Sequence, residues 1–270
     1  MKIVITADLH ADETADMGDA DMNRLCRQIR WYAPDVLIVA GDLVGLGKSW
    51  IVPTLERLAP PKCLKLIVPG NHDLWLEGGD SFGYYRTLLP ELYAACGWHM
   101  LDTGPKVVGS TAFVGTVGWY DYSFHDPASP LAPGKADYDY ETKRWGGMPM
   151  WMDAVFVRLG MSDTTFNSLL LARLREQIKS LPRRVKTIVA VSHHIAFQDM
   201  VIRKPHDQEW NFCNAFQGSA GLGELLLEDP RVRFHFCGHS HFKRRLKRGA
   251  LTSINIGSTY ERKRLEMVEV

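Results

Sequence analysis

Residues 234–243 read FHFCGHSHFK and place two histidines, His239 and His241, directly after an apolar run that ends at Cys237. A short apolar run of this kind predicts a buried β-strand. Two histidines in the turn after a strand can equally cap backbone groups, hydrogen-bond to neighbours or face water. The pair therefore indicates a functional site only if the fold brings further ligand-type side chains to the same place.

The same arrangement, an apolar run followed by ligand-type side chains, recurs along the chain. The runs that predict strands are Lys2–Thr6, Asp35–Ala40, Cys63–Val68, Lys186–Ser192 and Val232–Cys237. The side chains that follow them are Asp8, His10, Asp42, Asn71, His72, His193, His239 and His241. Sites in open α/β sheets form outside the carboxyl ends of the strands, so parallel strands would bring these side chains to one edge.

Helical spacing of apolar residues separates the first three predicted strands, at residues 22–32 and 50–58. This strand-helix-strand order predicts parallel neighbours joined by right-handed crossovers. A further helix is expected at 222–227, directly before a predicted strand. The first half of the chain is therefore expected to form a parallel sheet.

The most regular helical pattern lies at residues 162–182, with Ser162 or Asp163 as its N-cap and a proline at its end. Near the end of the chain, residues 251–257 and 265–270 alternate or run apolar. They are expected to be closing, antiparallel strands.

Length and composition are those of a globular protein: 270 residues, of which 46% are hydrophobic and 23% charged, suffice for a large core. A net charge of +1 gives no whole-protein field that would recruit nucleic acid or an anionic membrane. We find no signal-peptide pattern and no apolar run long enough to span a bilayer. The five cysteines are scattered without close pairs, which suits a reducing compartment, so we expect a cytoplasmic protein without a membrane partner.

We expect one domain over residues 1–270, with an irregular, aromatic-rich insertion at about 118–161. Its tryptophan and tyrosine content argues against disorder, and long irregular segments in compact domains are usually functional. Two interpretations remain open for Trp119, Tyr120 and Asp121. They either line a substrate pocket or belong to a packed loop.

The candidate ligands combine carboxylate, imidazole and amide oxygen without a thiolate, which favours divalent manganese, iron or zinc over a cysteine-type structural zinc site. Their number exceeds the needs of one ion, and a carboxylate can bridge two, so the set suits a two-metal site. Neutral histidine and asparagine ligands leave such a site positively charged and attractive to a phosphate oxygen. The residues therefore predict a phosphate ester as substrate.

Five short motifs, taken together and in order, resemble those of the calcineurin-like metallophosphoesterases. They read DLH at 8–10, GDLV at 41–44, GNHD at 70–73, SHH at 192–194 and GHSH at 238–241. The resemblance implies an α/β fold of four layers, with two facing mixed β-sheets flanked by helices. The chain lacks the acidic-arginine-glycine continuation that follows GD in the serine/threonine protein phosphatases, which favours the bacterial-type branch.

The resemblance also implies two divalent metal ions, with manganese favoured over iron or zinc. The residues implied around one ion are Asp8, His10, Asp42 and His241. Those implied around the other are Asn71, His193, His239 and the bridging Asp42. Either His193 or His194 can be the ligand in SHH, and we prefer His193 because the family's ligand is usually the first of such a pair.

By the same resemblance, His72 contacts the phosphate and protonates the leaving oxygen, while Asp73 orients the His72 ring. The implied reaction is hydrolysis of a small-molecule phosphomonoester or phosphodiester by attack of a metal-bridging hydroxide. A metal-dependent nuclease is one alternative, because the basic run at 242–248 could steer a polyanion, so nucleic acid is expected only as a substrate. A catalytically silent scaffold with the same fold is another.

Overall fold

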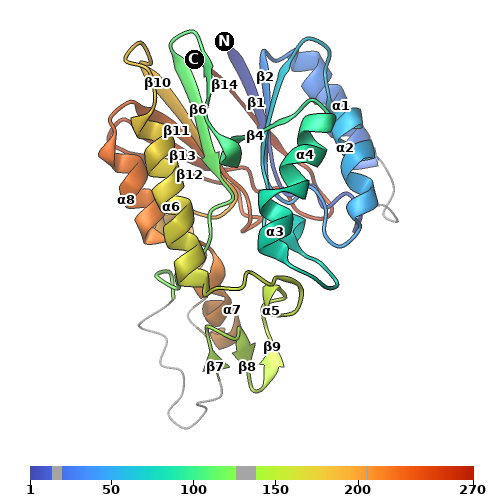
Figure 1. The fold of residues 1–270 in the computed structure, drawn as a ribbon, viewed down its shortest axis with the longest axis vertical. Helices are drawn as coiled ribbons and strands as arrows, with labels where there is room; N and C mark the ends of the chain where they lie inside the picture. Colours follow the sequence, from blue (N-terminus) through green and yellow to red (C-terminus); the bar gives the residue numbers. More distant parts are fainter. Residues whose placement is uncertain (14–19, 126–137, 205) are drawn as a thin grey trace.

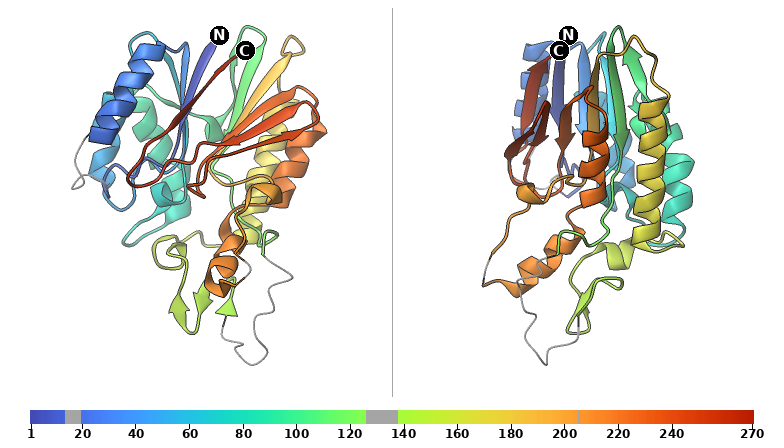
Figure 2. Two further views of the ribbon diagram at one scale, coloured as in Figure 1. Left: turned by 180° about the vertical axis from the view of Figure 1, so that it is seen from behind. Right: turned by 90° about the vertical axis from the view of Figure 1, so that its left-hand side faces the viewer.

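The computed structural model describes residues 1–13, 20–125, 138–204 and 206–270. Two large mixed β-sheets face each other and carry helices on their outer faces (Figure 1). The side view in Figure 2 shows the resulting order of layers, helices on the outside and sheets between them. The expected four-layer α/β fold is confirmed.

The first sheet has the strand order β14-β1-β2-β3-β4. Its strands are β1 (Lys2–Thr6), β2 (Val36–Ala40), β3 (Leu64–Val68), β4 (His99–Met100) and β14 (Leu265–Glu269). Strands β1 to β4 run parallel, as predicted for the first three, and β14 pairs antiparallel with β1. The helices on this side are α1 (Ala20–Tyr32), α2 (Ile51–Leu58), α3 (Ser81–Arg86) and α4 (Leu88–Ala95).

The second sheet has the strand order β12-β13-β11-β10-β6-β5. Its strands are β5 (Lys106–Val108), β6 (Thr111–Thr116), β10 (Thr187–Ser192), β11 (Val232–Cys237), β12 (Arg244–Arg248) and β13 (Leu251–Asn255). Its outer face is covered by α6 (Asp163–Lys179) and α8 (Ala220–Glu228).

One strand pairing differs from the prediction. Strand β13 runs antiparallel to β12 but parallel to β11, whereas an antiparallel closing strand was expected there. The chain leaves β11, forms β12 at the edge of the sheet and then turns back, so β13 inserts between β11 and β12 with the direction of β11. The expected antiparallel arrangement is therefore correct for β14 and wrong for β13 against β11.

The core between the sheets follows the two-residue period of the strands. In β1, Ile3 and Ile5 point toward the second sheet, where Phe113 and Phe236 belong to the same buried cluster. Val4 points the other way and packs with the helices of the first sheet. Strands buried on both faces need apolar residues at successive positions, which explains why the sequence shows continuous apolar runs rather than alternation.

Residues 138–156 and a neighbouring segment lie beyond the carboxyl ends of the parallel strands, at the lower end of Figure 1. They contain β7 (Tyr138–Asp139), β8 (Arg144–Trp145), β9 (Met148–Pro149), α5 (Asp153–Phe156) and α7 (Gln208–Cys213). Trp119 and Tyr120, at the start of the insertion, are fully buried, so they belong to a packed loop. Within the described residues, we find no helix whose length and apolar character would let it cross a membrane.

Candidate metal centre

The predicted site residues lie in the loops that follow β1, β2, β3, β10 and β11, where both sheets present the carboxyl ends of parallel strands. Most of them fall into two clusters at this edge of the sheets, and a third group joins His10 and His72 with Glu13. Each cluster offers one ligand atom per residue, and within a cluster these atoms lie within 4.8 Å of one another. The topology therefore converts residues far apart in sequence into neighbours.

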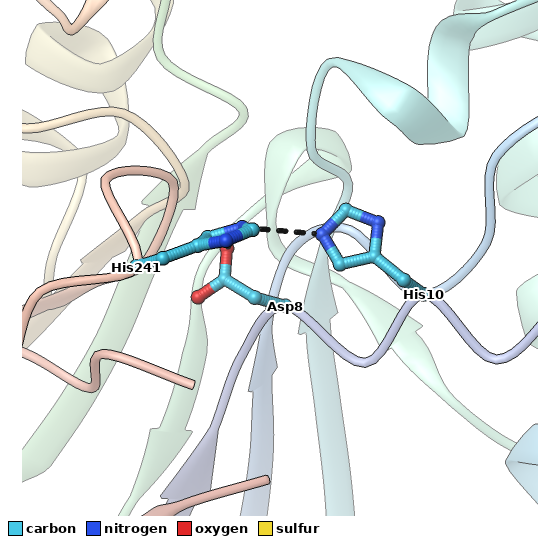
Figure 3. A group of neighbouring side chains, drawn as sticks. All are labelled: Asp8, His10 and His241. Atoms are coloured by element: carbon cyan, nitrogen blue, oxygen red, sulfur yellow. Dashed lines mark hydrogen bonds and ion pairs between the residues drawn. The ribbon is translucent and has the colours of Figure 1, made fainter. Parts of the chain in front are cut away.

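The first cluster consists of Asp8, His10 and His241. Figure 3 shows the two imidazoles pointing toward each other beside the Asp8 carboxylate, with the two Nε2 atoms 3.3 Å apart. The Nε2 atom of His241 also lies 3.8 Å from Asp8 Oδ1. All three residues were expected around one ion.

The second cluster consists of Asp42, His193 and His239. The Nε2 atom of His193 lies 3.1 Å from Asp42 Oδ2 and 3.1 Å from His239 Nδ1. The same Oδ2 atom of Asp42 lies 3.6 Å from His10 Nε2, so this carboxylate oxygen sits between the two clusters. This is the position that a bridging ligand requires.

The geometry distinguishes between the two adjacent histidines of SHH. His193 points into the second cluster, with its Nδ1 atom 3.0 Å from the carbonyl oxygen of Ala40. A backbone contact of this kind fixes the ring orientation of a metal-binding histidine. His194 directs its Nδ1 atom toward the carbonyl of Val117 and packs beside Trp119. This arrangement supports the preference for His193.

Asn71, expected as a ligand of the second ion, carries an amide oxygen in the loop after β3. Its Oδ1 atom is buried and has no hydrogen-bond partner among the described residues, and the same holds for Asp8 Oδ2. Buried acceptors of this kind are rare in folded proteins unless an ion or water satisfies them. The donor set of carboxylate, imidazole and amide oxygen therefore fits two hard or borderline divalent cations.

Asp153, at the start of α5, is a buried carboxylate that the sequence analysis did not single out. Its Oδ1 atom accepts hydrogen bonds from Asn71 Nδ2 (2.9 Å) and Trp75 Nε1 (2.6 Å). Its Oδ2 atom accepts from Trp151 Nε1 (2.8 Å) and Tyr120 Oη (3.1 Å). No local pattern marks this residue, since three of its four partners come from two other segments of the chain.

The hydrogen bonds of Asp73 correct one expectation. Asp73 does not hold the His72 ring, because its carboxylate accepts hydrogen bonds from the backbone N–H groups of Leu43, Val44 and Gly70. Its side chain thereby connects the loops after β2 and β3. These loops carry Asp42 and Asn71, so the hydrogen bonds of Asp73 help to fix the positions of both candidate ligands.

Glu13 instead occupies the place beside the His72 ring. The Oε1 atom of Glu13 lies 3.1 Å from His72 Nδ1, and the ring of His72 stacks on Trp75 at 3.6 Å between centroids. Hydrogen bonds with His10 and His72 lower the pKa of Glu13 to about 2. Glu13 follows DLH by three residues, a spacing that the sequence analysis did not use.

Several candidate ligands adopt an unusual backbone conformation. The residues with left-handed φ angles are Asp8 (54°), His10 (42°), Asp42 (51°), His239 (73°) and His241 (59°). For residues other than glycine this conformation costs on the order of 1–3 kcal/mol each, and it concentrates at functional sites. Gly70 has a different role: it lets the backbone approach Asp42 closely, since a Cβ atom there would overlap the Asp42 carboxylate.

Burial and charge act in opposite directions on the two carboxylates. Burial raises the pKa of Asp8 to about 6. Burial would also raise the pKa of Asp42, but His193 and His72 outweigh it and hold that pKa well below its usual range. The same pairing raises the pKa of His193 to about 9 against the effect of burial. The carboxylates and imidazoles of the site therefore bind protons in competition with one another. A divalent cation that binds these ligands would displace those protons.

The family model described as calcineurin-like phosphoesterase matches residues 1–243. The chain belongs to this family. Its members are metal-dependent hydrolases of phosphate esters, and the dinuclear divalent metal centre that the family implies agrees with the two clusters of candidate ligands. Among curated proteins, none is significantly similar to this chain.

Solved structures share the fold at low sequence identity. The phosphopantetheinyl hydrolase of Mycobacterium tuberculosis superimposes with a TM-score of 0.73 at 19% identity, covering 96% of this chain and 90% of its own. A dimetal phosphatase from Danio rerio gives 0.51 at 13% identity, with coverage of 99% and 91%. The calcineurin-like phosphoesterase YfkN from Bacillus subtilis gives 0.52 at 13% identity, with coverage of 97% and 82%. At these identities the similarity concerns the fold alone.

Proposed function

We propose that this protein hydrolyses a phosphomonoester or phosphodiester of a small molecule with the help of two divalent cations. The observation that carries this proposal is the position of Asp42 Oδ2, which lies 3.1 Å from His193 Nε2 and 3.6 Å from His10 Nε2, one atom from each cluster. The residues proposed to hold the cations are Asp8, His10, Asp42, Asn71, His193, His239 and His241.

When bound, the two cations would polarise the phosphoryl oxygens and make water a stronger nucleophile at neutral pH. The ligand set without thiolate favours manganese, with iron and zinc as alternatives. The chain itself supplies two carboxylates and five neutral ligands, four imidazoles and one amide, which leaves the bound site positive toward a phosphate group.

His72 is proposed to contact the phosphate and to protonate the leaving oxygen. Asp42 and Glu13 outweigh the effect of burial and raise the pKa of His72, which favours the protonated form of the ring. Stacking on Trp75 and the contact with Glu13 hold the ring in one orientation. A positioned, protonated imidazole is the form that a general acid requires.

We propose that residues 1–270 act as one catalytic unit rather than as a core with a dispensable insertion. Asp153 and Trp151 come from the insertion and contact Asn71 and His239, respectively. These contacts support the proposal because the insertion shapes the ligand set directly.

The test is turnover by protein reconstituted with manganese, iron or zinc. The substrates are 4-nitrophenyl phosphate, bis(4-nitrophenyl) phosphate and single-stranded DNA, and the variants are Asp42→Asn and His72→Ala. We expect turnover of at least one nitrophenyl ester and a loss of activity in both variants. Turnover of DNA alone would favour the nuclease, and absence of turnover with every metal would favour the silent scaffold.

The basic run gives the nuclease alternative little support. In the hairpin that contains β12, Lys243 and Arg245 form ion pairs with Glu266. Arg248 likewise forms an ion pair with Asp199. Two carboxylates therefore offset part of the positive charge of this run, which lowers its attraction for a nucleic acid backbone.

A further inference from the structure

A cavity of about 420 Å³ opens beside the candidate metal centre, and its floor is formed by His239 and His241. Because these two histidines belong to different clusters, the cavity adjoins both clusters. The cavity lies between β9, α7 and the start of the β12 hairpin. It is therefore placed to receive the organic part of an ester.

The walls of the cavity are mainly apolar. They are formed by Met150, Trp151, Ile202, Trp210 and Phe242. Trp151 lies 5.5 Å from the His239 ring and stacks on Phe216, and Trp210 contacts Phe242 edge to face. Aromatic walls of this kind bury an uncharged hydrocarbon surface with little loss of side-chain freedom.

Asn214 presents a hydrogen-bond acceptor in this cavity. The backbone N–H of Lys204 donates to Asn211 Oδ1, which fixes the orientation of the Asn211 amide. Asn214 Nδ2 in turn donates to that same oxygen, so the Oδ1 atom of Asn214 faces away from it. No described residue donates to Asn214 Oδ1, although Asn214 is only 3% exposed.

Gln217, which also lines the cavity, carries a second candidate hydrogen-bond acceptor. Its Oε1 atom is buried and has no hydrogen-bond partner among the described residues. A buried acceptor without a donor is costly, and a ligand that supplies the donor recovers that cost. Gln217 and Asn214 lie one turn apart along the chain and both line the cavity, so they would act on the same ligand.

The charges of the cavity exclude a second anionic group. Its described lining residues include the carboxylates of Asp207 and Glu209 but no lysine or arginine. Lys204 partly balances Asp207, at 3.7 Å, and stacks on the outside of Trp210. Glu209 forms no ion pair within the described part of the chain and is exposed. Ligands with a further phosphate or carboxylate are therefore disfavoured here.

We infer that this cavity binds the alcohol part of the ester, and that this part is an uncharged, largely apolar group carrying an N–H or O–H donor, such as a secondary amide. The inference rests on the proposed phosphoesterase function and adds the class of substrate. Asn214 Oδ1 and Gln217 Oε1 accept from the donor, the aromatic walls cover the hydrocarbon, and Glu209 repels anions.

A matched series of 4-nitrophenyl phosphodiesters tests the inference. The second substituent is a methyl group, a short chain with a secondary amide, the same chain with an ester oxygen in place of the N–H, or the same chain ending in a carboxylate. We expect kcat/KM for the amide to exceed that for the ester isostere by about tenfold, the usual effect of leaving a buried acceptor unpaired. The carboxylate compound is expected to be the poorest of the three long chains.

Two variants and a control assign the effect to named groups. Gln217→Met removes the acceptor and is expected to bring the amide-to-ester ratio close to one. Glu209→Gln is expected to improve the carboxylate compound selectively. Gln198→Met makes the same substitution at an exposed glutamine outside the cavity and should leave every ratio as in the wild type.

Calorimetric titration with the non-hydrolysable phosphonates of the amide and the ester isostere gives a readout besides turnover. Tighter binding of the amide phosphonate, lost in Gln217→Met, supports the cavity assignment. Equal binding and equal kcat/KM of amide and ester overturn it, while turnover of the methyl compound leaves the phosphoesterase function intact. If no compound is turned over with any metal, the proposed function fails, and the titrations then decide the cavity assignment separately.

Discussion

The Nδ2 group of Asn71 donates a hydrogen bond to Asp153 Oδ1 across 2.9 Å, which joins the loop after β3 to a helix that begins 82 residues later. Because the amide nitrogen is held by the carboxylate, the Asn71 oxygen points away from Asp153, and it is buried without a hydrogen-bond partner among the described residues. The same carboxylate holds Trp75, on which His72 stacks. One residue of the insertion therefore orients a candidate ligand and supports the candidate general acid.

Asp153→Asn should weaken metal binding. An asparagine cannot accept all four hydrogen bonds, and its own N–H groups oppose the donors of Asn71 and the neighbouring aromatic residues. Loss of a partner that orients a metal ligand typically costs about 10–100-fold in affinity or activity. Competition with a chromogenic chelator measures the affinity, and kcat should fall with it.

Asp163→Asn is the matched control for this prediction. Asp163 is also a buried carboxylate near the insertion, and it accepts from Trp119 Nε1, Tyr122 Oη and Lys143 Nζ, none of them a candidate ligand. This variant should lower the unfolding temperature without changing metal affinity. Equal metal affinity in Asp153→Asn and wild type would refute the orienting role.

Glu13→Gln should slow the chemical step more than it changes metal content. Glutamine keeps the size of the side chain but removes the charge 3.1 Å from His72 Nδ1, so the His72 ring loses its orientation and part of its proton affinity. We expect kcat to fall by roughly tenfold, at the low end of general-acid effects. Steady-state kinetics at saturating metal, with metal analysis of the same sample, checks this prediction.

Asp73→Asn should mainly affect stability. Its carboxylate accepts from three backbone N–H groups, and an asparagine leaves at least one of these buried donors unpaired, which costs about 1–3 kcal/mol of unfolding free energy. Urea unfolding measures the loss. If Asp73→Asn instead lowers kcat as far as His72→Ala while stability is unchanged, the originally expected role beside His72 is correct.

His239→Ala and His241→Ala should remove different ions. Each histidine belongs to one cluster only, while Asp42 lies between both. We expect each histidine variant to retain one of the two ions, and Asp42→Asn to lose both at low metal concentration. Metal analysis after dialysis gives the occupancy, and His125→Ala, at an exposed histidine, should bind metal like the wild type.

Asp102 gives a pH dependence of stability away from the metal centre. Burial raises its pKa to about 6, although Tyr85 and the backbone of Val117 donate hydrogen bonds to it. The folded protein therefore binds this proton more tightly than the unfolded chain, so the contribution of Asp102 to stability is largest below pH 4 and is lost as the pH rises to about 6. Asp102→Asn keeps the acceptor without the charge.

Unfolding by urea at several pH values between 4 and 7 tests this expectation. The free energy of unfolding of Asp102→Asn relative to wild type should increase as the pH rises through this window. A constant difference would show that the two states bind the Asp102 proton equally.

Local signals predicted the strands and the strongest helix well. Strand β11 has the predicted bounds, and Ser162 caps α6 with its hydroxyl, which accepts from the backbone N–H of Thr165. These features depend on residues close in sequence. The clustering of the candidate ligands was also predictable, because parallel strands impose it on any residue that follows them.

Long-range contacts were not predictable in this way. The parallel pairing of β13 depends on where the β12 hairpin inserts, and the roles of Asp153 and Glu13 depend on partners in other segments. Asp73 also shows that residues close in sequence need not act together. Its place beside His72 in sequence suggested a shared task, but its side chain points toward the backbone of another loop.

The left-handed backbone at Asp8, His10, Asp42, His239 and His241 has a consequence for how this protein responds to selection. Glycine adopts this conformation without penalty, so a glycine at His241 relieves strain that the native residue keeps. A laboratory search for heat-resistant variants that ignores activity will therefore enrich glycines at these positions. At these five positions, a substitution that raises thermal stability is therefore expected to lower the rate of turnover.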